Sequence, residues 1–177
     1  MRVLGIDPGT ITTGWGVVEK GASGRLIYVS DGEIKTPERA SLSEKLLVIS
    51  SGLKEAIRRT APTACAVESV FFARNARSAV ILGHARGVSL LSAAELGLPV
   101  YEYSPATVKQ TVSSYGRADK AQVGKMISLL LKRGDFTGPD ATDALAVAIC
   151  HIHHGAAARL NVIGNQWLAR QKAGLPK

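Results

Sequence analysis

The chain has 177 residues, of which 46% are hydrophobic and 20% are charged, as expected for one globular domain with a substantial core. Its net charge of +8 favours an anionic partner, with nucleic acid ahead of a membrane surface, although a merely soluble basic protein has the same composition. The longest clean apolar run, residues 144–150, is far too short to cross a bilayer, and no signal peptide is recognisable. We therefore expect a cytoplasmic protein.

The two cysteines, Cys65 and Cys150, both lie in apolar runs. This placement is typical of small buried side chains in a reducing compartment, rather than of a disulfide framework. We expect both thiols to be buried and unpaired.

The predicted elements begin with three strands, at residues 3–7, 15–19 and 25–36, whose short links favour an antiparallel meander. The remaining predicted elements, in chain order, are a helix at 42–60 that starts with a capping box, a strand at 63–68, a helix at 75–96 rich in small residues, a strand at 100–103, and helices at 106–114, 120–133 and 139–154. This order predicts an α/β protein with a five-stranded mixed sheet flanked by helices on both faces.

The first strand is an apolar run without polar alternation, residues 3–6, and it ends on a carboxylate, Asp7. Such a run predicts a strand covered on both faces, so Asp7 is expected at the rim of the core. Residues 7–10 (Asp-Pro-Gly-Thr) have the pattern of a type II turn. Gly9, Gly14 and Gly16 leave the backbone bare, so that a bulky partner can approach closely. On this stretch alone, the simpler explanation is that Asp7 starts a hairpin turn.

A second apolar strand, residues 63–68, also ends on an acid, Glu68. If this strand lies parallel to the first and next to it, Glu68 and Asp7 project at the same edge of the sheet. In open α/β sheets that edge is where ligands bind.

A third acidic group stands at the start of the last helix, where Asp140 and Asp143 are three residues apart and share one helix face. That face continues through Ala144 and Val147, which predicts that it faces the protein rather than water. A charge on an otherwise apolar helix costs several kcal/mol or more unless it is paired or bound to a metal, which favours metal binding for Asp143. Asp140 is equally well explained by the helix dipole, which favours acids in a first turn.

Hard oxygen ligands, with few histidines or cysteines nearby, favour Mg²⁺ or Mn²⁺ over zinc. The predicted catalytic metal ligands are Asp7, Glu68, Asp140 and Asp143. Two such ions about 4 Å apart can activate a water and stabilise the leaving oxygen during phosphodiester cleavage. Cations between the carboxylates and a phosphate also remove a repulsion that a basic protein would otherwise build into its own binding site. The acids therefore indicate catalysis rather than binding alone.

Five segments of the sequence resemble one known family. In chain order they are GIDPG in the first strand, VESVFFARNARSA around Glu68, LGHARG, VKQTV and PDATDALAVAI. Together, from Val3 to about His154, they resemble the RuvC family of bacterial Holliday-junction resolvases. Each motif is weak by itself, but five in the same order are highly specific. Residues 1–155 are therefore expected to form a nuclease domain, and residues 156–177, where the match fades, a basic C-terminal tail.

The resemblance implies a ribonuclease H-like fold and a homodimer that makes Mg²⁺-dependent paired nicks, placed symmetrically across a four-way DNA junction. It also implies a branch-migration motor of the RuvA and RuvB type as a partner. The family's four acidic ligands fall on the four acids named above without departure. Its basic residues near the scissile phosphate fall on Lys109 and Lys120, its stacking phenylalanine on Phe71, and its dimer helix on residues 75–96.

The residue types suit these roles, and each also has a simpler structural explanation. An exposed Phe71 can stack on an unpaired base, whereas core packing is the alternative. Lys120 follows a helix cap and can reach a phosphate, although a solvated surface lysine is equally simple. We interpret Arg74 and Arg77 as contacts to the phosphate backbone. The three histidines within residues 151–154 lie near a helix end, where positive charge suits the dipole, and we do not expect them to be metal ligands.

Three other classes of protein are alternatives to a junction resolvase. A ribonuclease H acting on RNA–DNA hybrids has the same metal chemistry, and the spacing of the acids does not exclude it. An ATP-binding kinase of the actin and sugar-kinase type also carries Asp-x-Gly-Thr in its first hairpin, but it needs a second domain for which 177 residues leave no room. A non-catalytic basic DNA-binding protein leaves the four acids without a reason.

Overall fold

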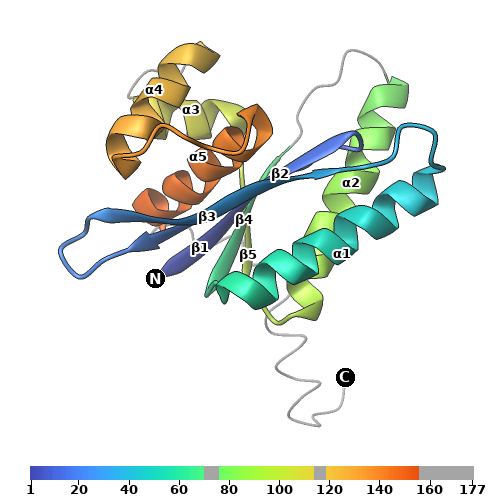
Figure 1. Ribbon diagram of the computed structural model, residues 1–177, viewed down its shortest axis with the longest axis horizontal. Coiled ribbons are helices and arrows are strands. Elements are labelled where there is room, and N and C mark those ends of the chain that lie inside the picture. Colours follow the sequence, from blue (N-terminus) through green and yellow to red (C-terminus); the bar gives the residue numbers. More distant parts are fainter. Residues whose placement is uncertain (70–75, 114–118, 156–177) are drawn as a thin grey trace, which may run out of the picture.

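A five-stranded sheet with helices on both faces forms the protein, as described by a computed structural model for residues 1–69, 76–113 and 119–155 (Figure 1). The strand order across the sheet is β3-β2-β1-β4-β5. The elements are β1 Arg2–Asp7, β2 Thr12–Lys20, β3 Leu26–Lys35, α1 Leu42–Thr60, β4 Ala64–Glu68, α2 Ala76–Glu95, β5 Val100–Tyr103, α3 Pro105–Ser113, α4 Lys120–Leu131 and α5 Pro139–His154. The predicted fold class and order of elements are confirmed.

The sheet is mixed because its two halves are connected differently. β1, β2 and β3 form the predicted antiparallel meander, while β1 pairs parallel with β4, and β4 with β5. Val3 lies opposite Ala64 and Ile6 opposite Val67, so the two central strands end side by side. This register brings Asp7 and Glu68 to the same edge of the sheet.

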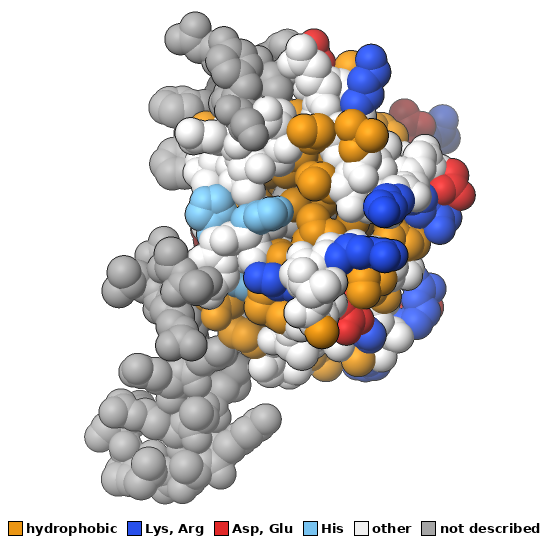
Figure 2. All heavy atoms as spheres, turned by 90° about the vertical axis from the view of Figure 1, so that its left-hand side faces the viewer, with side chains coloured by type: hydrophobic (Ala, Val, Ile, Leu, Met, Phe, Trp, Pro, Cys, Tyr) orange, Lys and Arg blue, Asp and Glu red, His pale blue; other side chains and the backbone are white. Residues whose placement is uncertain are grey.

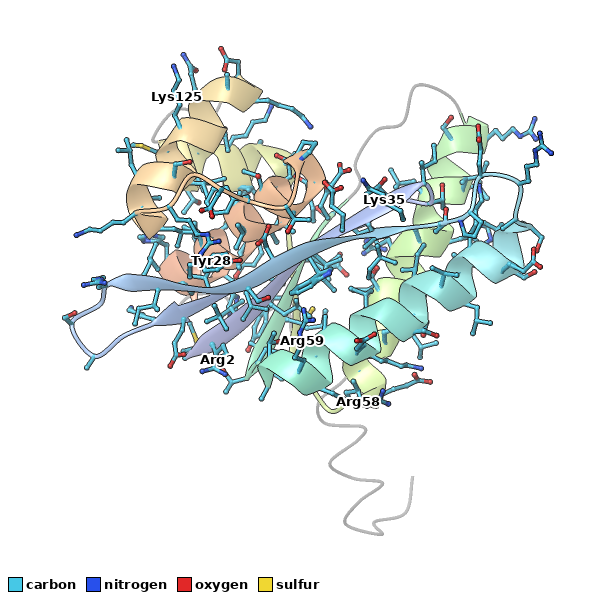
Figure 3. All side chains as sticks on the ribbon, viewed as in Figure 1. Arg2, Tyr28, Lys35, Arg58, Arg59 and Lys125 are labelled. Carbon is cyan, nitrogen blue, oxygen red and sulfur yellow. The ribbon has the colours of Figure 1, made fainter. Side chains whose placement is uncertain are left out.

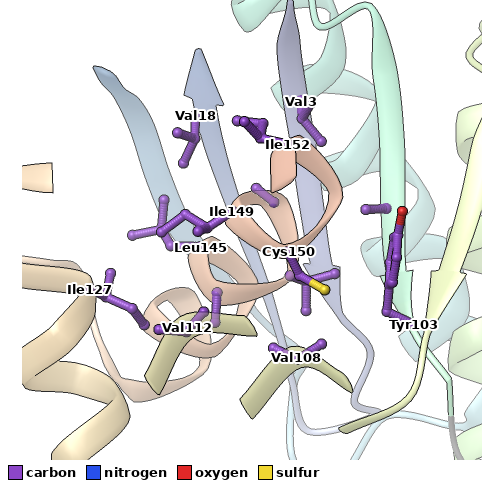
Figure 4. Packing of buried hydrophobic residues seen from close by; sticks show 14 of the residues in the cluster. Val3, Val18, Tyr103, Val108, Val112, Ile127, Leu145, Ile149, Cys150 and Ile152 are labelled. Atoms are coloured by element: carbon purple, nitrogen blue, oxygen red, sulfur yellow. The ribbon is translucent and has the colours of Figure 1, made fainter. Parts of the chain in front are cut away.

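Side chains that alternate between the two faces of the central strands divide the core into two layers. Val3 contacts the layer under α3, α4 and α5, whereas Leu4 contacts the layer under α1 and α2. Figure 4 shows Leu145 and Ile149 of α5 inserted into the first layer. As expected, Cys65 and Cys150 are both buried and unpaired. Within the described residues, no helix is both long and apolar enough to span a bilayer.

The last helix, α5, lies directly on glycines of the sheet. A Cβ atom on Gly14 would lie 1.9 Å from the carbonyl oxygen of Asp140, and one on Gly5 would lie 2.0 Å from that of Ala144. A Cβ atom on Gly16 would collide with Leu145. The bulky partner that the bare backbone was expected to admit is therefore α5 of the same chain at Gly14 and Gly16, whereas Gly9 faces Thr12.

The predicted type II turn at residues 7–10 is wrong, because Gly9 does not have the positive φ that such a turn requires at its third residue. The buried Thr13 instead closes this loop: its Oγ1 donates a hydrogen bond to the Gly9 carbonyl at 2.6 Å and accepts one from the Gly9 N–H at 3.3 Å. A Cβ atom on Gly9 would lie 2.1 Å from the carbonyl oxygen of Thr12. Gly9 is thus required for space and not for a left-handed backbone.

Local capping explains where three helices begin. Ser41 and Glu44 form the predicted capping box at the start of α1. Asp119 caps α4, and its partner in a second capping box is Gln122. Pro139 occupies the first turn of α5, where its missing N–H costs nothing.

Candidate active site

Three carboxylates converge where the C-terminal end of β1 meets the first turn of α5. Asp7, Asp140 and Asp143 each offer one oxygen, and these oxygens all lie within 4.8 Å of one another. The i and i+3 positions on α5 point both helix acids the same way, and the bare backbone of Gly14 lets the first turn of α5 approach β1 and β2 closely. The local sequence therefore builds the cluster from a strand end and a helix start.

The fourth predicted acid, Glu68, lies beside this cluster and outside its 4.8 Å limit. Glu68 shares a hydrogen bond with Asp7. Both carboxylates open into a cavity of about 240 Å³, whose lining residues are Asp7, Glu68, Pro105, Val108, Lys109, Lys120, Val123, Asp143 and Ala146. Asp7 and Asp143 thus belong to both the cluster and the cavity, whereas Asp140 belongs to the cluster and Glu68 lines the cavity.

Burial and mutual repulsion make the charged form of these acids costly. Burial, followed by the charges of Glu68, Asp143 and Asp140, raises the pKa of Asp7 to about 8. Burial and Asp143 also raise the pKa of Glu68. One proton shared between the two carboxyl groups satisfies the hydrogen bond between Asp7 and Glu68. A cation placed among these oxygens would relieve the repulsion.

Two lysines provide positive charge at the cavity. The Nζ of Lys120 lies 2.8 Å from Oδ2 of Asp143, and this hydrogen bond and ion pair raise the pKa of Lys120. The Lys120 side chain is nevertheless 77% exposed, so its ammonium group is accessible to a ligand. Lys109 of α3 lines the same cavity, and its charge opposes the rise in the pKa of Glu68. The structure therefore brings both predicted lysines to the acids.

A further acid at this site, Glu33, was missed by the sequence analysis. Its side chain is 7% exposed, and its Oε1 accepts a hydrogen bond of 3.2 Å from the N–H of Asp140. Asp7, Gly14 and Glu33 form one row across the three antiparallel strands, since Gly14 pairs with both of the others. The register of the meander was the signal that could have identified Glu33, because the row places it beside α5.

The remaining predicted DNA contacts are only partly described. Phe71 and Arg74 lie outside the described residues. Arg77 lies in the first turn of α2, and its side chain is exposed. These three assignments stay predictions.

The expectation that the histidines near the end of α5 carry positive charge is wrong for His151. Its ring is buried, and its Nδ1 lies 2.8 Å from the hydroxyl of Tyr103. Burial, followed by the charge of His154, lowers the pKa of His151 to about 4. Burial also lowers the pKa of the neighbouring His153. His151 is therefore a neutral core residue near physiological pH.

A mixed sheet with carboxylates at the ends of its central parallel strands, under the first turn of a helix, defines a nuclease with the ribonuclease H-like fold. The model of the family "Crossover junction endodeoxyribonuclease RuvC" matches residues 3–151. The chain belongs to this family.

Individual relatives agree with the family match. A crossover junction endodeoxyribonuclease RuvC from Syntrophotalea carbinolica is 51% identical over 153 residues, which are 86% of this chain and 94% of that protein. The protein of the same name from Halorhodospira halophila is 48% identical over 88% of this chain and 92% of its own length. RuvC from Thermus thermophilus, solved in complex with a Holliday junction substrate, superimposes with a TM-score of 0.79 at 32% identity, covering 89% of this chain and 96% of that one.

Proposed function

We propose that this protein is a structure-selective DNA endonuclease that resolves four-way junctions by paired symmetric nicks during recombination and repair. The observation that carries the proposal is the convergence of Asp7, Asp140 and Asp143 in a chain of the RuvC family. A relative with the same fold over 89% of this chain was solved with a Holliday junction substrate. Family membership makes the three rival classes weaker explanations of the same acids.

The reaction requires a divalent metal ion, and we favour Mg²⁺, with Mn²⁺ as a substitute. The donor set fits these ions, because carboxylate oxygens are the ligands that they prefer. The crowded acids also repel one another, and a cation would reduce this repulsion. Asp7, Glu68, Asp140 and Asp143 are the residues that would hold two such ions. When bound, such ions lower the pKa of water and stabilise the leaving oxygen of the phosphodiester.

The chain's own residues prepare this chemistry by moving protons and charge. Asp7 and Glu68 would hold cations with both carboxylates once the proton they share has passed to solvent water. Lys120 is paired with Asp143 and exposed, so its ammonium group would be available to a phosphate oxygen at the cavity. Lys109 approaches the same phosphate from α3.

Junction DNA is the proposed ligand of the basic surface. The face toward α4 and the β2–β3 hairpin carries more Lys and Arg than Asp and Glu (Figure 2). Lys125 projects outward from α4 on this side (Figure 3). Neutralised phosphates release counterions, so this surface supports affinity without base specificity. Phe71, stacking on an unpaired base, and Arg74 and Arg77, on the backbone, complete the proposed contacts.

Paired nicks need two active sites, and we propose a homodimer formed through α2. Val80 and Leu91 on this helix are 60% and 57% exposed, although both are apolar. Gly83 and Gly87 are exposed as well, and a Cβ atom on either would meet nothing within 4 Å. Small and apolar residues together allow a second helix to approach closely. A branch-migration motor of the RuvA and RuvB type and a cytoplasmic location complete the proposal.

The experiment that tests this function compares cleavage of three substrates: a synthetic four-way junction, plain duplex DNA and an RNA–DNA hybrid. Each is incubated with Mg²⁺, with Mn²⁺ and with a chelator. We expect symmetric nicks confined to the junction, and only with a divalent ion. Cleavage of the hybrid in place of the junction would support the ribonuclease H alternative, and tight binding without any cleavage would support the binding protein.

A further inference from the structure

We propose that Glu33 is a positioning residue, which caps α5 from the neighbouring edge strand and thereby holds Asp140 and Asp143 in place. The inference rests on the proposed nuclease function, since it concerns the geometry of the same acids. Glu33 is not part of the group of carboxylates within 4.8 Å among the described residues. Its two oxygens face the N–H of Asp140 and the ammonium group of Lys35, so we assign it the role of placing other ligands.

The first turn of α5 needs a hydrogen-bond acceptor that its own sequence does not supply. The first N–H groups of any helix lack intrahelical partners, and a side chain at the N-cap normally accepts one of them. The N-cap residue of α5 is Gly138, which makes no side-chain hydrogen bond. Glu33 takes this role, because its Oε1 accepts the hydrogen bond from the N–H of Asp140, the second residue of the helix.

Gly138 and Glu33 fit each other sterically. A Cβ atom on Gly138 would lie 2.1 Å from Oε1 of Glu33 and 2.9 Å from Oε2. The carboxylate of Glu33 thus fills the space that a side chain at the N-cap would use. Gly138 has an extended backbone with φ of 176°, which other residues also adopt, so the glycine is explained by this space and not by its conformation.

The edge strand β3 holds the segment before α5 at two points. Asp31, two residues before Glu33, accepts a hydrogen bond of 2.7 Å from the N–H of Thr137 through Oδ2. The two carboxylates therefore bind backbone groups on either side of Gly138. The Nζ of Lys35 lies 3.4 Å from Oε2 of Glu33.

The consequence for the active site follows from the residue that Glu33 binds. The N–H of Asp140 belongs to the same residue whose carboxylate joins the three-acid cluster. Fixing this backbone fixes the direction in which Asp140 and, one turn later, Asp143 leave the helix. Displacements of about 1 Å at a catalytic group can cost about a hundredfold in rate, so a capping bond at this point affects function.

Substitutions at two positions separate the cap from other effects. Glu33→Gln keeps a carbonyl acceptor for the N–H of Asp140, whereas Glu33→Ala removes it. Gly138→Ala keeps the carboxylate but displaces it. The double variant Glu33→Ala/Gly138→Ser places a hydroxyl at the N-cap, in the space that Glu33 has left. Glu19→Ala is the matched control, because Glu19 binds Arg2 at the opposite end of the sheet.

Two measurements report on these variants: Mn²⁺ affinity of the DNA-free protein, followed by electron paramagnetic resonance, and single-turnover nicking of a four-way junction. We expect Glu33→Ala and Gly138→Ala to weaken Mn²⁺ binding and slow nicking by about tenfold each. Glu33→Gln and the double variant should lie within about threefold of the wild type, and Glu19→Ala should match it.

Equal losses in Glu33→Gln and Glu33→Ala would overturn the proposal, since they would assign the effect to charge. Wild-type behaviour of Glu33→Ala, or a double variant no better than Glu33→Ala, would also overturn it. Gly138→Ala keeps the test decisive if Glu33→Ala does not fold. A wild-type protein that binds Mn²⁺ but nicks no junction would refute the proposed function alone, because the Mn²⁺ series would still measure the cap.

Discussion

Buried ionisable groups lie at both ends of α5, and their pKa values shift in opposite directions. At the N-terminal end, Asp140 and Asp143 lie beside Asp7, whose pKa burial and like charges raise to about 8. At the C-terminal end, His151 lies beside Tyr103, and burial lowers its pKa to about 4. Burial disfavours the charged form at both ends.

The difference is that only one end is satisfied by the chain itself. Neutral His151 has a hydrogen-bond partner in Tyr103, so the C-terminal end stabilises the fold as it stands. The acids at the N-terminal end repel one another, and a positive ion relieves this repulsion better than the exposed Lys120 can. We infer that the C-terminal end of the helix serves stability and that the N-terminal end, in the proposed active site, is arranged for catalysis at the expense of stability.

The largest effect is expected from the removal of an acid at the N-terminal end of α5. Asp7→Asn should lower the nicking rate by more than about a hundredfold, because even residues that only support a metal ligand typically cost 10–100-fold. Glu68→Gln and Asp143→Asn should act in the same direction. Gel-based nicking of a synthetic junction measures the rate, and a binding assay on the same junction is the control. Nicking by Asp7→Asn at the wild-type rate would contradict the metal assignment.

At the C-terminal end the expected effect is on stability. His151→Ala should lower the free energy of unfolding by about 2–4 kcal/mol, because it opens a cavity and leaves the Tyr103 hydroxyl without its partner. Denaturant unfolding measures this change, and His153→Ala, at an exposed neighbouring position, is the matched control. Mn²⁺ affinity should stay the same in both variants. A loss of Mn²⁺ affinity in His151→Ala would show that the two ends are coupled.

The pH dependence of stability in metal-free protein should also differ between the ends. Folded Asp7 keeps a proton up to about pH 8, which the unfolded chain loses near its ordinary pKa of 3.8, so this group makes the protein less stable as pH rises through that window. His151 has the opposite sign: its pKa falls from 6.5 to about 4, so its contribution to stability is lost as pH falls through that range. Asp7→Asn should therefore gain stability over the wild type as pH rises, measured by denaturant unfolding in a chelator. A constant difference between the two proteins would rule out the raised pKa.

The smallest expected effect lies away from α5, at the predicted phosphate contact Arg77. Arg77→Ala should weaken junction binding at every sequence and reduce the slope of log affinity against log salt by about one. Titrations of junction binding at several salt concentrations measure the slope. An unchanged slope would remove Arg77 from the DNA interface.

Much of the fold could be predicted because its signals are local. The apolar runs before Asp7 and Glu68 predict buried strands, and Ser41 and Pro139 mark helix starts through hydrogen bonds and sterics within a few residues. The meeting of Asp7 and Glu68 could be expected from one rule, that parallel strands present their ends at the same edge of a sheet. The approach of Asp140 and Asp143 depends in addition on the packing of α5 against Gly14.

The features that sequence analysis missed depend on contacts between distant segments. Glu33 is an ordinary strand residue until the register places it beside Gly138. Gly9 has the pattern of a type II turn, but the side chain of Thr13 closes the loop instead. The sequence position of His151 predicts a charged residue at a helix end, but the ring is buried and hydrogen-bonded to the hydroxyl of Tyr103. In each case a tertiary contact overrides a sound local rule.

The most direct test of the site is to locate Mn²⁺ by anomalous scattering in crystals of the protein with a four-way junction. We predict anomalous peaks bound by oxygens of Asp7, Asp140 and Asp143, with Glu68 at the edge of the same site. Mn²⁺ bound elsewhere on the chain, with these carboxylates free of metal in a nicking-competent complex, would contradict this prediction.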